Sequence, residues 1–122
     1  MMKYTLITVY GIPNCDTVKK ARTWLSEQGI EHVFHDFKKQ GLPEKNLDTW
    51  LKEAGWEAVL NRKGTSWRKL SPEEQLSVIN AATARPFLMA NPSLVKRPVI
   101  EWQSSKGMEI SVGFQPNEWP LR

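Results

Sequence analysis

Residues 4–18 read Tyr4-Thr-Leu-Ile-Thr-Val-Tyr-Gly-Ile-Pro-Asn-Cys-Asp-Thr-Val18, and this stretch decides the fold. Its first half is apolar, aromatic and β-branched, which is typical of a buried strand that ends at Gly11. After a short turn, apolar residues recur at helical spacing as far as Ser26, and Gly29 is well placed just past the helix end. The stretch therefore predicts a strand, a turn and a helix in that order.

A second strand is expected after this helix. Residues 31–37 alternate, with Val33, His35 and Phe37 on one face. A strand, a helix and a second strand of these lengths form a crossover whose strands pair in parallel. The fold class is therefore α/β.

The middle of the chain is expected to be helical. One helix should end at Gly55, because an apolar stripe precedes it, formed by Leu47, Trp50, Leu51 and Ala54.

A capping box predicts the start of another helix at Ser71, with Pro72 at its first position and Glu74 at its third, ahead of the apolar residues Leu76 and Ile79. Residues 85–95 hold two prolines and several apolar residues, which predicts a short helical turn leading into a loop.

The last part of the chain predicts a hairpin, because residues 98–102 and 108–112 flank Ser104-Ser-Lys-Gly107. The expected order is strand, helix, strand, a helical insert of about residues 41–95, hairpin and short tail. That order is compatible with a thioredoxin-like sheet carrying a helical insertion, although periodicity alone leaves several topologies open.

Length and composition predict how many domains the chain forms and whether it contacts a membrane. The chain has 122 residues, 40% of them hydrophobic, which favours one domain, residues 1–122, with a real core over a disordered protein. The segment from Tyr4 to Tyr10 is too short and too rich in threonine to cross a bilayer, and no tripartite signal precedes it. We therefore expect a soluble cytoplasmic protein without membrane contacts.

The net charge of +4 raises the question of a nucleic-acid partner. The basic residues, however, fall in short scattered groups with acidic residues between them. We do not expect nucleic-acid binding, and a local anion site is at least as consistent with this pattern.

Chemistry is expected at Cys15, the single cysteine of the chain, which lies in the turn that leads into the first helix. Unpaired amides and the helix dipole favour an anion at that position, and they lower the pKa of a thiol. Lys19 would act in the same direction. The alternative is that Cys15 is a small buried hydrophobic residue without a reactive role.

The sequence resembles the arsenate reductase (ArsC) family, which is coupled to glutaredoxin, and more closely its Spx/YffB-like branch of thiol reductases and regulators. The segments that carry the resemblance stand in order along nearly the whole chain: Tyr10–Ala21, Phe34–Asp36, Gly55–Leu70, Lys96–Val99 and Val112–Phe114. The resemblance implies a thioredoxin fold with a helical insert and a catalytic cysteine at Cys15. It also implies glutathione as a co-substrate, no tightly bound cofactor, and glutathione or glutaredoxin as the redox partner.

The same resemblance implies a set of substrate-binding and anion-binding residues. Arg97 matches an arginine that holds the anion in the arsenate reductases, and either Arg62 or Lys63 would fill a second basic position. Asn14, next to the cysteine, belongs to the same set. An arginine fork suits a carboxylate or oxyanion because it offers two parallel donors, whereas a lysine offers a point charge. Taken alone, each basic residue would be read as a solvated surface charge.

Pro98 resembles the cis proline that thioredoxin folds place opposite the reactive cysteine. Most X-Pro bonds in folded proteins are trans, so Pro98 taken alone would be expected in trans. The family resemblance implies the cis form instead. The implied consequence is a substrate backbone docked beside residues 96–98.

Two departures from the family pattern narrow the chemistry. Residues 110–114 lack the third arginine of arsenate reductases, so we do not expect arsenate as the substrate. Redox-switching Spx regulators carry a second cysteine where this chain has Val18, so the resolving thiol must come from another molecule.

The two histidines of the chain suggest little further chemistry. His32 and His35 are too few for a histidine-rich metal site, and a dyad of Cys15 and His35 is a further alternative.

The leading hypothesis is a monothiol reductase that attacks an oxidised thiol or a small oxyanion and is regenerated by glutathione. The rival hypothesis is an Spx-like adaptor that docks on a protein such as RNA polymerase and uses no catalytic thiol. A third reading is a reductase-like relic without activity.

Overall fold

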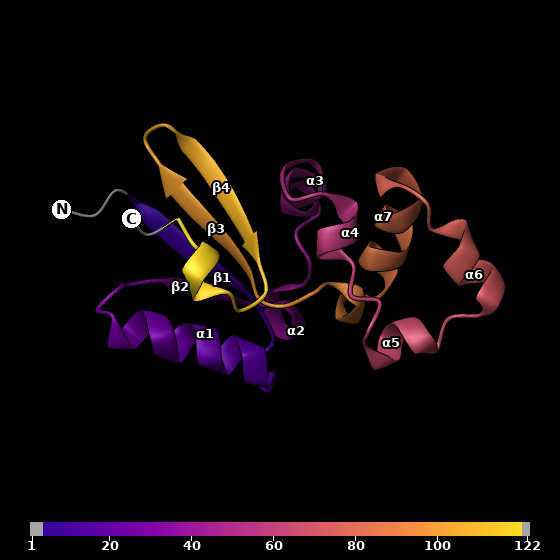
Figure 1. Ribbon diagram of the computed structural model, residues 1–122, viewed down its shortest axis with the longest axis horizontal. Coiled ribbons are helices and arrows are strands. Elements are labelled where there is room, and N and C mark those ends of the chain that lie inside the picture. The colour runs from indigo at the N-terminus through magenta and orange to yellow at the C-terminus, as the bar shows by residue number, and fades with distance from the viewer. Residues whose placement is uncertain (1–3, 121–122) are drawn as a thin grey trace. The chain divides into compact units, whose positions relative to one another are not determined.

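The computed structural model describes residues 4–120 (Figure 1). The chain divides into two compact units, of which one joins the described residues up to Gly41 with those from Arg97 onward, and the other is Leu42–Lys96. The second unit corresponds closely to the helical insert expected at about residues 41–95. The single domain expected from the chain's length stays a prediction.

The first unit is built on a four-stranded mixed sheet in the order β2-β1-β3-β4. β1 pairs in parallel with β2, whereas the pairs β1–β3 and β3–β4 are antiparallel. The strands are β1 (Leu6–Gly11), β2 (Val33–Asp36), β3 (Val99–Ser104) and β4 (Gly107–Val112), and α1 (Asp16–Glu27) connects β1 to β2. This arrangement confirms the predicted α/β fold of thioredoxin-like type.

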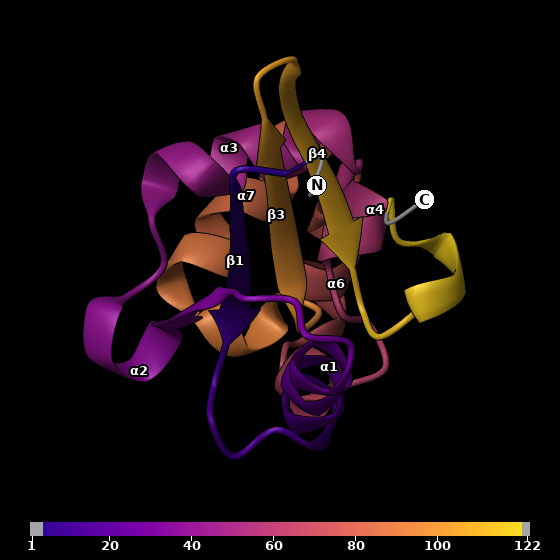
Figure 2. The same cartoon turned by 90° about the vertical axis from the view of Figure 1, so that its left-hand side faces the viewer.

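α1 covers one face of this sheet (Figure 2). The register pairs Val9 with Ile100, and both side chains are fully buried in a core that also holds Leu25 of α1. Trp119 of the C-terminal tail joins this core with its ring 5.3 Å from that of Trp24, edge to face. Apolar alternation along β1 and β3 therefore specifies which face meets the helix.

The second strand is shorter than expected. Val33 is 52% exposed, and Phe37 is the first residue of the short helix α2 (Phe37–Gln40). The carboxylate of Asp36 accepts a hydrogen bond from the backbone N–H of Lys38 at 2.9 Å, so it caps α2 and ends the strand. The prediction that Val33, His35 and Phe37 share one strand face is therefore wrong.

The predicted hairpin is confirmed. β3 and β4 meet at a tight turn in which Ser104 pairs with Gly107. Gly107 has a φ of +134°, a conformation that side chains rarely adopt. The tail then continues into a short 3-10 helix, η2 (Pro116–Glu118).

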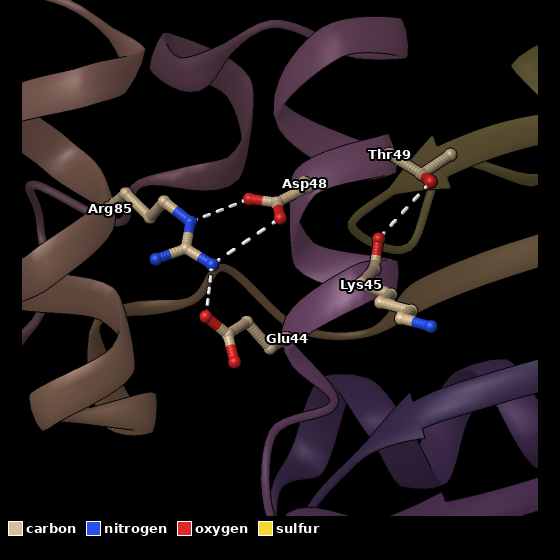
Figure 3. A network of polar contacts seen from close by, with 5 residues as sticks. All are labelled: Glu44, Lys45, Asp48, Thr49 and Arg85. Atoms are coloured by element: carbon tan, nitrogen blue, oxygen red, sulfur yellow. Dashed lines mark hydrogen bonds and ion pairs between the residues drawn. The ribbon is translucent and has the colours of Figure 1, made fainter.

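The second unit consists of short helices. They are α3 (Glu44–Glu53), α4 (Trp56–Val59), α5 (Thr65–Arg68), α6 (Pro72–Ser77), α7 (Ala81–Ala90) and the 3-10 helix η1 (Pro92–Leu94). The predicted stripe of α3 is confirmed, since Leu47, Trp50 and Leu51 are buried. Arg85 of α7 forms ion pairs with Glu44 and Asp48 of α3, which ties these two helices together (Figure 3).

The capping box of α6 is present, but the apolar face expected behind it is not buried. The hydroxyl of Ser71 accepts from the backbone N–H of Glu74 at 3.1 Å, and the carboxylate of Glu74 accepts from the N–H of Ser71 at 2.9 Å. Leu76 and Ile79 are nevertheless 79% and 68% exposed. The helix ends at Ser77, so the stripe is too short to cover a core.

A full helix also replaces the short turn predicted for residues 85–95. α7 runs for ten residues with Pro86 inside it. Its start is fixed by Asn80, whose side chain accepts from the N–H of Thr83 at 2.9 Å while the Thr83 hydroxyl accepts from the N–H of Asn80 at 3.0 Å. Pro86 removes one donor and crowds the carbonyl one turn earlier, but the cap at Asn80 and the burial of Ala84 and Leu88 keep the helix continuous through it.

Within residues 4–120, no helix combines the length and the hydropathy needed to cross a membrane.

Candidate active site

The thiol lies where the turn after β1 enters α1. Cys15 is the N-cap residue of α1, with an extended backbone (φ −98°, ψ 125°), and its carbonyl accepts the N–H of Lys19 at 3.0 Å. Its side chain is partly exposed and forms no disulfide. The free N–H groups of the first helical turn therefore surround a solvent-accessible sulfur.

A glycine sets the distance between β1 and the start of α1. A Cβ added to Gly11 would lie 2.6 Å from Cγ2 of Val18, a contact that real side chains do not make. Val18 is itself only 1% exposed and lies three residues after Cys15. The absence of a side chain at Gly11 thus lets α1 approach the strand.

The sulfur has three stabilising partners. Its Sγ atom lies 3.1 Å from the hydroxyl of Thr17, and the backbone N–H of Val18 and the guanidinium of Arg97 also favour its charged form. Partial burial alone would raise the pKa of the Cys15 thiol, but these polar neighbours and the positive charge of Arg97 outweigh burial. The net result is a pKa below the ordinary thiol value, which favours the nucleophilic thiolate.

Thr17 also links the thiol to the loop before β3. Its hydroxyl lies 3.3 Å from the backbone carbonyl oxygen of Arg97 and 3.1 Å from the sulfur of Cys15. Its single proton goes to the carbonyl while Cys15 is a thiol, and the same proton can turn to the sulfur once Cys15 is a thiolate. A single side chain therefore bridges two segments that are far apart in sequence. The sequence analysis did not select Thr17, although a hydroxyl residue two positions after a helix-capping cysteine is a usable signal.

The peptide bond between Arg97 and Pro98 is cis, as the family resemblance implies. The carbonyl of Pro98 accepts the N–H of Gly113 at 2.8 Å, which anchors this loop to the end of β4. The Nε atom of Arg97 is buried and has no hydrogen-bond partner among residues 4–120. Arg97 therefore combines contact with the sulfur and one donor that the protein itself leaves unused.

The other predicted site residues differ in their surroundings. Asn14 is exposed and directly precedes Cys15. Arg62 and Lys63 belong to the second unit, where the Arg62 guanidinium lies 4.9 Å from the ring centroid of Trp56 and 4.0 Å from a carboxylate oxygen of Glu57. The proposed roles of these three residues in binding stay predictions.

His35 contacts other groups than the thiol. Its Nε2 atom lies 2.8 Å from the carbonyl of Gly41, and its ring lies 4.9 Å from that of Tyr10. The structure therefore offers no support for a dyad of Cys15 and His35. Across residues 4–120, no group of three His, Cys, Asp or Glu side chains is arranged to hold a metal ion.

Comparison with known proteins gives consistent matches. The model of a family described as the ArsC family matches residues 10–120. The solved structure of a protein described as YffB is 42% identical with a TM-score of 0.81, covering 91% of this chain and 93% of that one. The solved structure of an arsenate reductase related protein from Brucella melitensis is 47% identical with a TM-score of 0.72, covering 93% and 91%. The global transcriptional regulator Spx of Streptococcus agalactiae is 28% identical over 115 residues, which span 93% of this chain and 80% of Spx.

Proposed function

The chain belongs to the ArsC family, and on this premise we propose that it is a thiol reductase with Cys15 as its only nucleophile and glutathione as its reductant. The single observation that carries the proposal is the environment of the sulfur. Thr17, the N–H of Val18 and Arg97 all stabilise its anionic form, so its pKa is lowered despite partial burial. A low pKa and an accessible sulfur are what distinguish a reactive cysteine from a structural one.

The proposed reaction begins with attack of the Cys15 thiolate on one sulfur of a substrate disulfide. A mixed disulfide with Cys15 forms, the substrate S–S bond breaks, and the second substrate sulfur leaves as a thiolate that takes up a proton. A glutathione thiolate then attacks the Cys15 sulfur and releases the first substrate thiol. A second glutathione attacks that adduct, which restores Cys15 and yields oxidised glutathione. One disulfide is reduced and two glutathione molecules are oxidised.

The first glutathione has to resolve the mixed disulfide with the substrate because the chain has one cysteine. Val18 occupies the position where a second thiol would form a Cys-x-x-Cys pair, so no internal thiol can resolve the mixed disulfide. Reducing equivalents can arrive as glutathione itself or through a glutaredoxin. Dependence on glutathione places the reaction in a reducing compartment, for which the cytoplasm is our proposal.

Arg97 supports an anionic substrate group beside the sulfur. Arg97 is partly exposed although its Nε is buried, so a carboxylate can approach the guanidinium from solvent and pair with its charge. Glutathione carries two carboxylates, so it can engage this arginine while its sulfur faces Cys15. Arsenate is not proposed, since residues 110–114 provide no further basic side chain.

A second candidate function is an adaptor that binds a protein partner without thiol chemistry. The observation that favours it is the similarity to a global transcriptional regulator, Spx, over 93% of this chain. The two candidates make opposite predictions for Cys15. An adaptor keeps its partner binding when the thiol is removed, whereas a reductase loses its activity.

Intact mass spectrometry after exposure to oxidised glutathione tests the proposal. We expect one glutathione adduct per chain, mapped to Cys15 by peptide mass, and its removal by reduced glutathione at a saturable rate. Cys15→Ser is the matched control, because it removes the sulfur and keeps a side chain of similar size.

Absence of an adduct on the native chain would contradict the reductase proposal. So would an adduct that reduced glutathione cannot remove, because the second half of the cycle would then be missing.

A further inference from the structure

A cavity of about 740 Å³ lies beside the start of β1, apart from the thiol. Its lining comes from residues 4–7 at the start of β1, from α1, and from residues 29–33, which lead into β2. It does not include Cys15, Thr17 or Arg97. The volume is within the range of about 300–1,000 Å³ that is usual for small-molecule sites. The residues that matter for its chemistry are Leu6, Arg22, Ser26, Glu31, His32 and Val33.

Arg22 supplies a cation that no carboxylate in the described part of the chain, residues 4–120, pairs with. Its guanidinium carbon lies 4.4 Å from the centroid of the Phe34 ring, and its Nε–H donates to Nε2 of His32 at 3.4 Å. Among residues 4–120 it forms no ion pair, and the rest of its N–H groups have no hydrogen-bond partner. A guanidinium held in this way presents a fork of donors that fits a carboxylate.

His32 fixes the orientation of Arg22. Its Nδ1 atom lies 3.3 Å from the carbonyl of Ile30, so an Nδ1–H donor there leaves Nε2 free to accept from Arg22. Stacking on Phe34 and the hydrogen bond to His32 restrain the guanidinium from two sides. Little side-chain freedom then remains to be lost when a ligand binds.

Two exposed apolar side chains border the same cavity. Leu6 and Val33 are 45% and 52% exposed, and each is the first residue of its strand. Large aliphatic side chains left in water at a cavity are typical of a surface that an apolar ligand covers. Glu31 also lines the cavity and disfavours a polyanion.

We propose that this cavity binds a small monoanionic amphiphile, whose carboxylate pairs with Arg22 and whose apolar chain covers Leu6 and Val33. The site is independent of the thiol chemistry proposed above, since no residue that contacts the sulfur lines it.

Amide NMR shifts of the full chain during titration with octanoate test this proposal, with octanamide as the uncharged isostere. We expect saturable shifts centred on Leu6, His32 and Val33. Arg22→Gln should weaken octanoate binding about tenfold and leave octanamide binding unchanged, because only the carboxylate uses the charge. Leu6→Ser should weaken both probes.

Lys20→Gln is the matched control, because Lys20 is an exposed cation on the same helix and does not line the cavity. An equal loss in the Lys20 and Arg22 variants would overturn the proposal in favour of general electrostatics.

Arg22 also borders a second hollow of about 510 Å³ that includes Lys19 and Thr23. Shifts centred on those two residues, or no saturation at all, would equally overturn the proposal. Cys15→Ser should bind octanoate like the native chain, so this test stays separate from the test of thiol chemistry.

Discussion

Two arginines, one in each unit, show how the same side chain serves different ends. In the helical unit, the Nε of Arg85 lies 2.6 Å from a carboxylate oxygen of Asp48, and one terminal nitrogen lies 2.5 Å from Glu44 (Figure 3). In the sheet unit, Arg97 contacts the sulfur of Cys15 and keeps a buried Nε without a partner. Arg85 is paired with carboxylates and joins helices, whereas Arg97 is partly exposed and has no ion pair among residues 4–120, so its charge is available to a ligand.

The pKa shifts follow the same division. The hydrogen bonds that Arg85 donates to Asp48 and then to Glu44 raise its pKa above the ordinary value, and Arg85 in turn lowers the pKa of Asp48. The charges of that network act on one another. In the sheet unit, Arg97 and two neutral donors act on a single thiol, and their net effect is to lower its pKa. The proposed function rests on that difference, because charges that act on a thiol favour its thiolate form, whereas charges that pair with one another do not.

The largest effect is expected from Cys15→Ser, because it removes the thiol that distinguishes the surroundings of Arg97 from those of Arg85. The variant should lose glutathione adduct formation and disulfide reduction completely, because no other cysteine exists in the chain. Its urea unfolding midpoint should stay within error of the native value, since the side chain is partly exposed. Disulfide reduction by the Cys15→Ser variant above the rate of glutathione alone would contradict the proposed role of Cys15.

Arg97→Met should lower kcat/KM for a glutathionylated peptide about tenfold, the usual effect of losing a charged hydrogen bond. It should also raise the midpoint of the pH profile of iodoacetamide alkylation, because the thiolate loses a cation. Arg97→Lys is the matched control. It should restore the pH profile of alkylation more fully than it restores kcat/KM, because lysine keeps the positive charge but lacks the two parallel donors of arginine. An unchanged profile in Arg97→Met would show that Arg97 does not act on the thiol.

Thr17→Val should give a smaller effect of the same sign. The change keeps the shape of the side chain and removes the hydroxyl that stabilises the thiolate, so the thiol pKa rises. Below that pKa a smaller fraction of the protein carries the thiolate, and alkylation at pH 7 should slow about threefold. Thr23→Val, on the exposed face of the same helix, should leave the rate unchanged. Equal rates for Thr17→Val and the native chain would contradict the proposed bridge.

The smallest effect is expected in the helical unit. Arg85→Gln should lower the urea midpoint slightly, more than Lys45→Gln on α3, and neither should alter alkylation of Cys15. The difference should vanish in about 1 M salt, where screening acts within about 3 Å.

pH gives a second way to separate the ion-pair contribution from other effects. Asp48 has a lowered pKa in the folded chain, so its contribution is present above the ordinary value of about 3.9 and is lost as the pH falls through the lower folded value. A loss that persists in high salt would assign Arg85 a packing role instead.

The sheet and the thiol were predictable from the sequence, because both depend on local patterns. The apolar, β-branched and aromatic run of β1 and the helical spacing of Val18, Ala21 and Leu25 predict the strand, the helix and the turn that carries Cys15. Arg97 and Pro98 were reached through resemblance alone. No local pattern brings residues of the loop before β3 to a cysteine more than 80 positions earlier.

The errors arise where tertiary structure overrides a local rule. Leu76 and Ile79 match an apolar helix face, but a pattern cannot show whether a partner surface exists. Pro86 predicts an interruption, yet the cap at Asn80 starts a helix that continues through it. Thr17 was missed because its role depends on a distance of 3.1 Å to the sulfur, which composition does not encode.

Gly11 has a consequence for the tolerance of the chain to mutation. Because any Cβ there would collide with Val18, even alanine would displace the first turn of α1 and with it Cys15 and Thr17. In a library that samples every position, Gly11 should score as strictly as the nucleophile while contacting no substrate. A map of mutational sensitivity would therefore outline the active site at a residue that has no side chain.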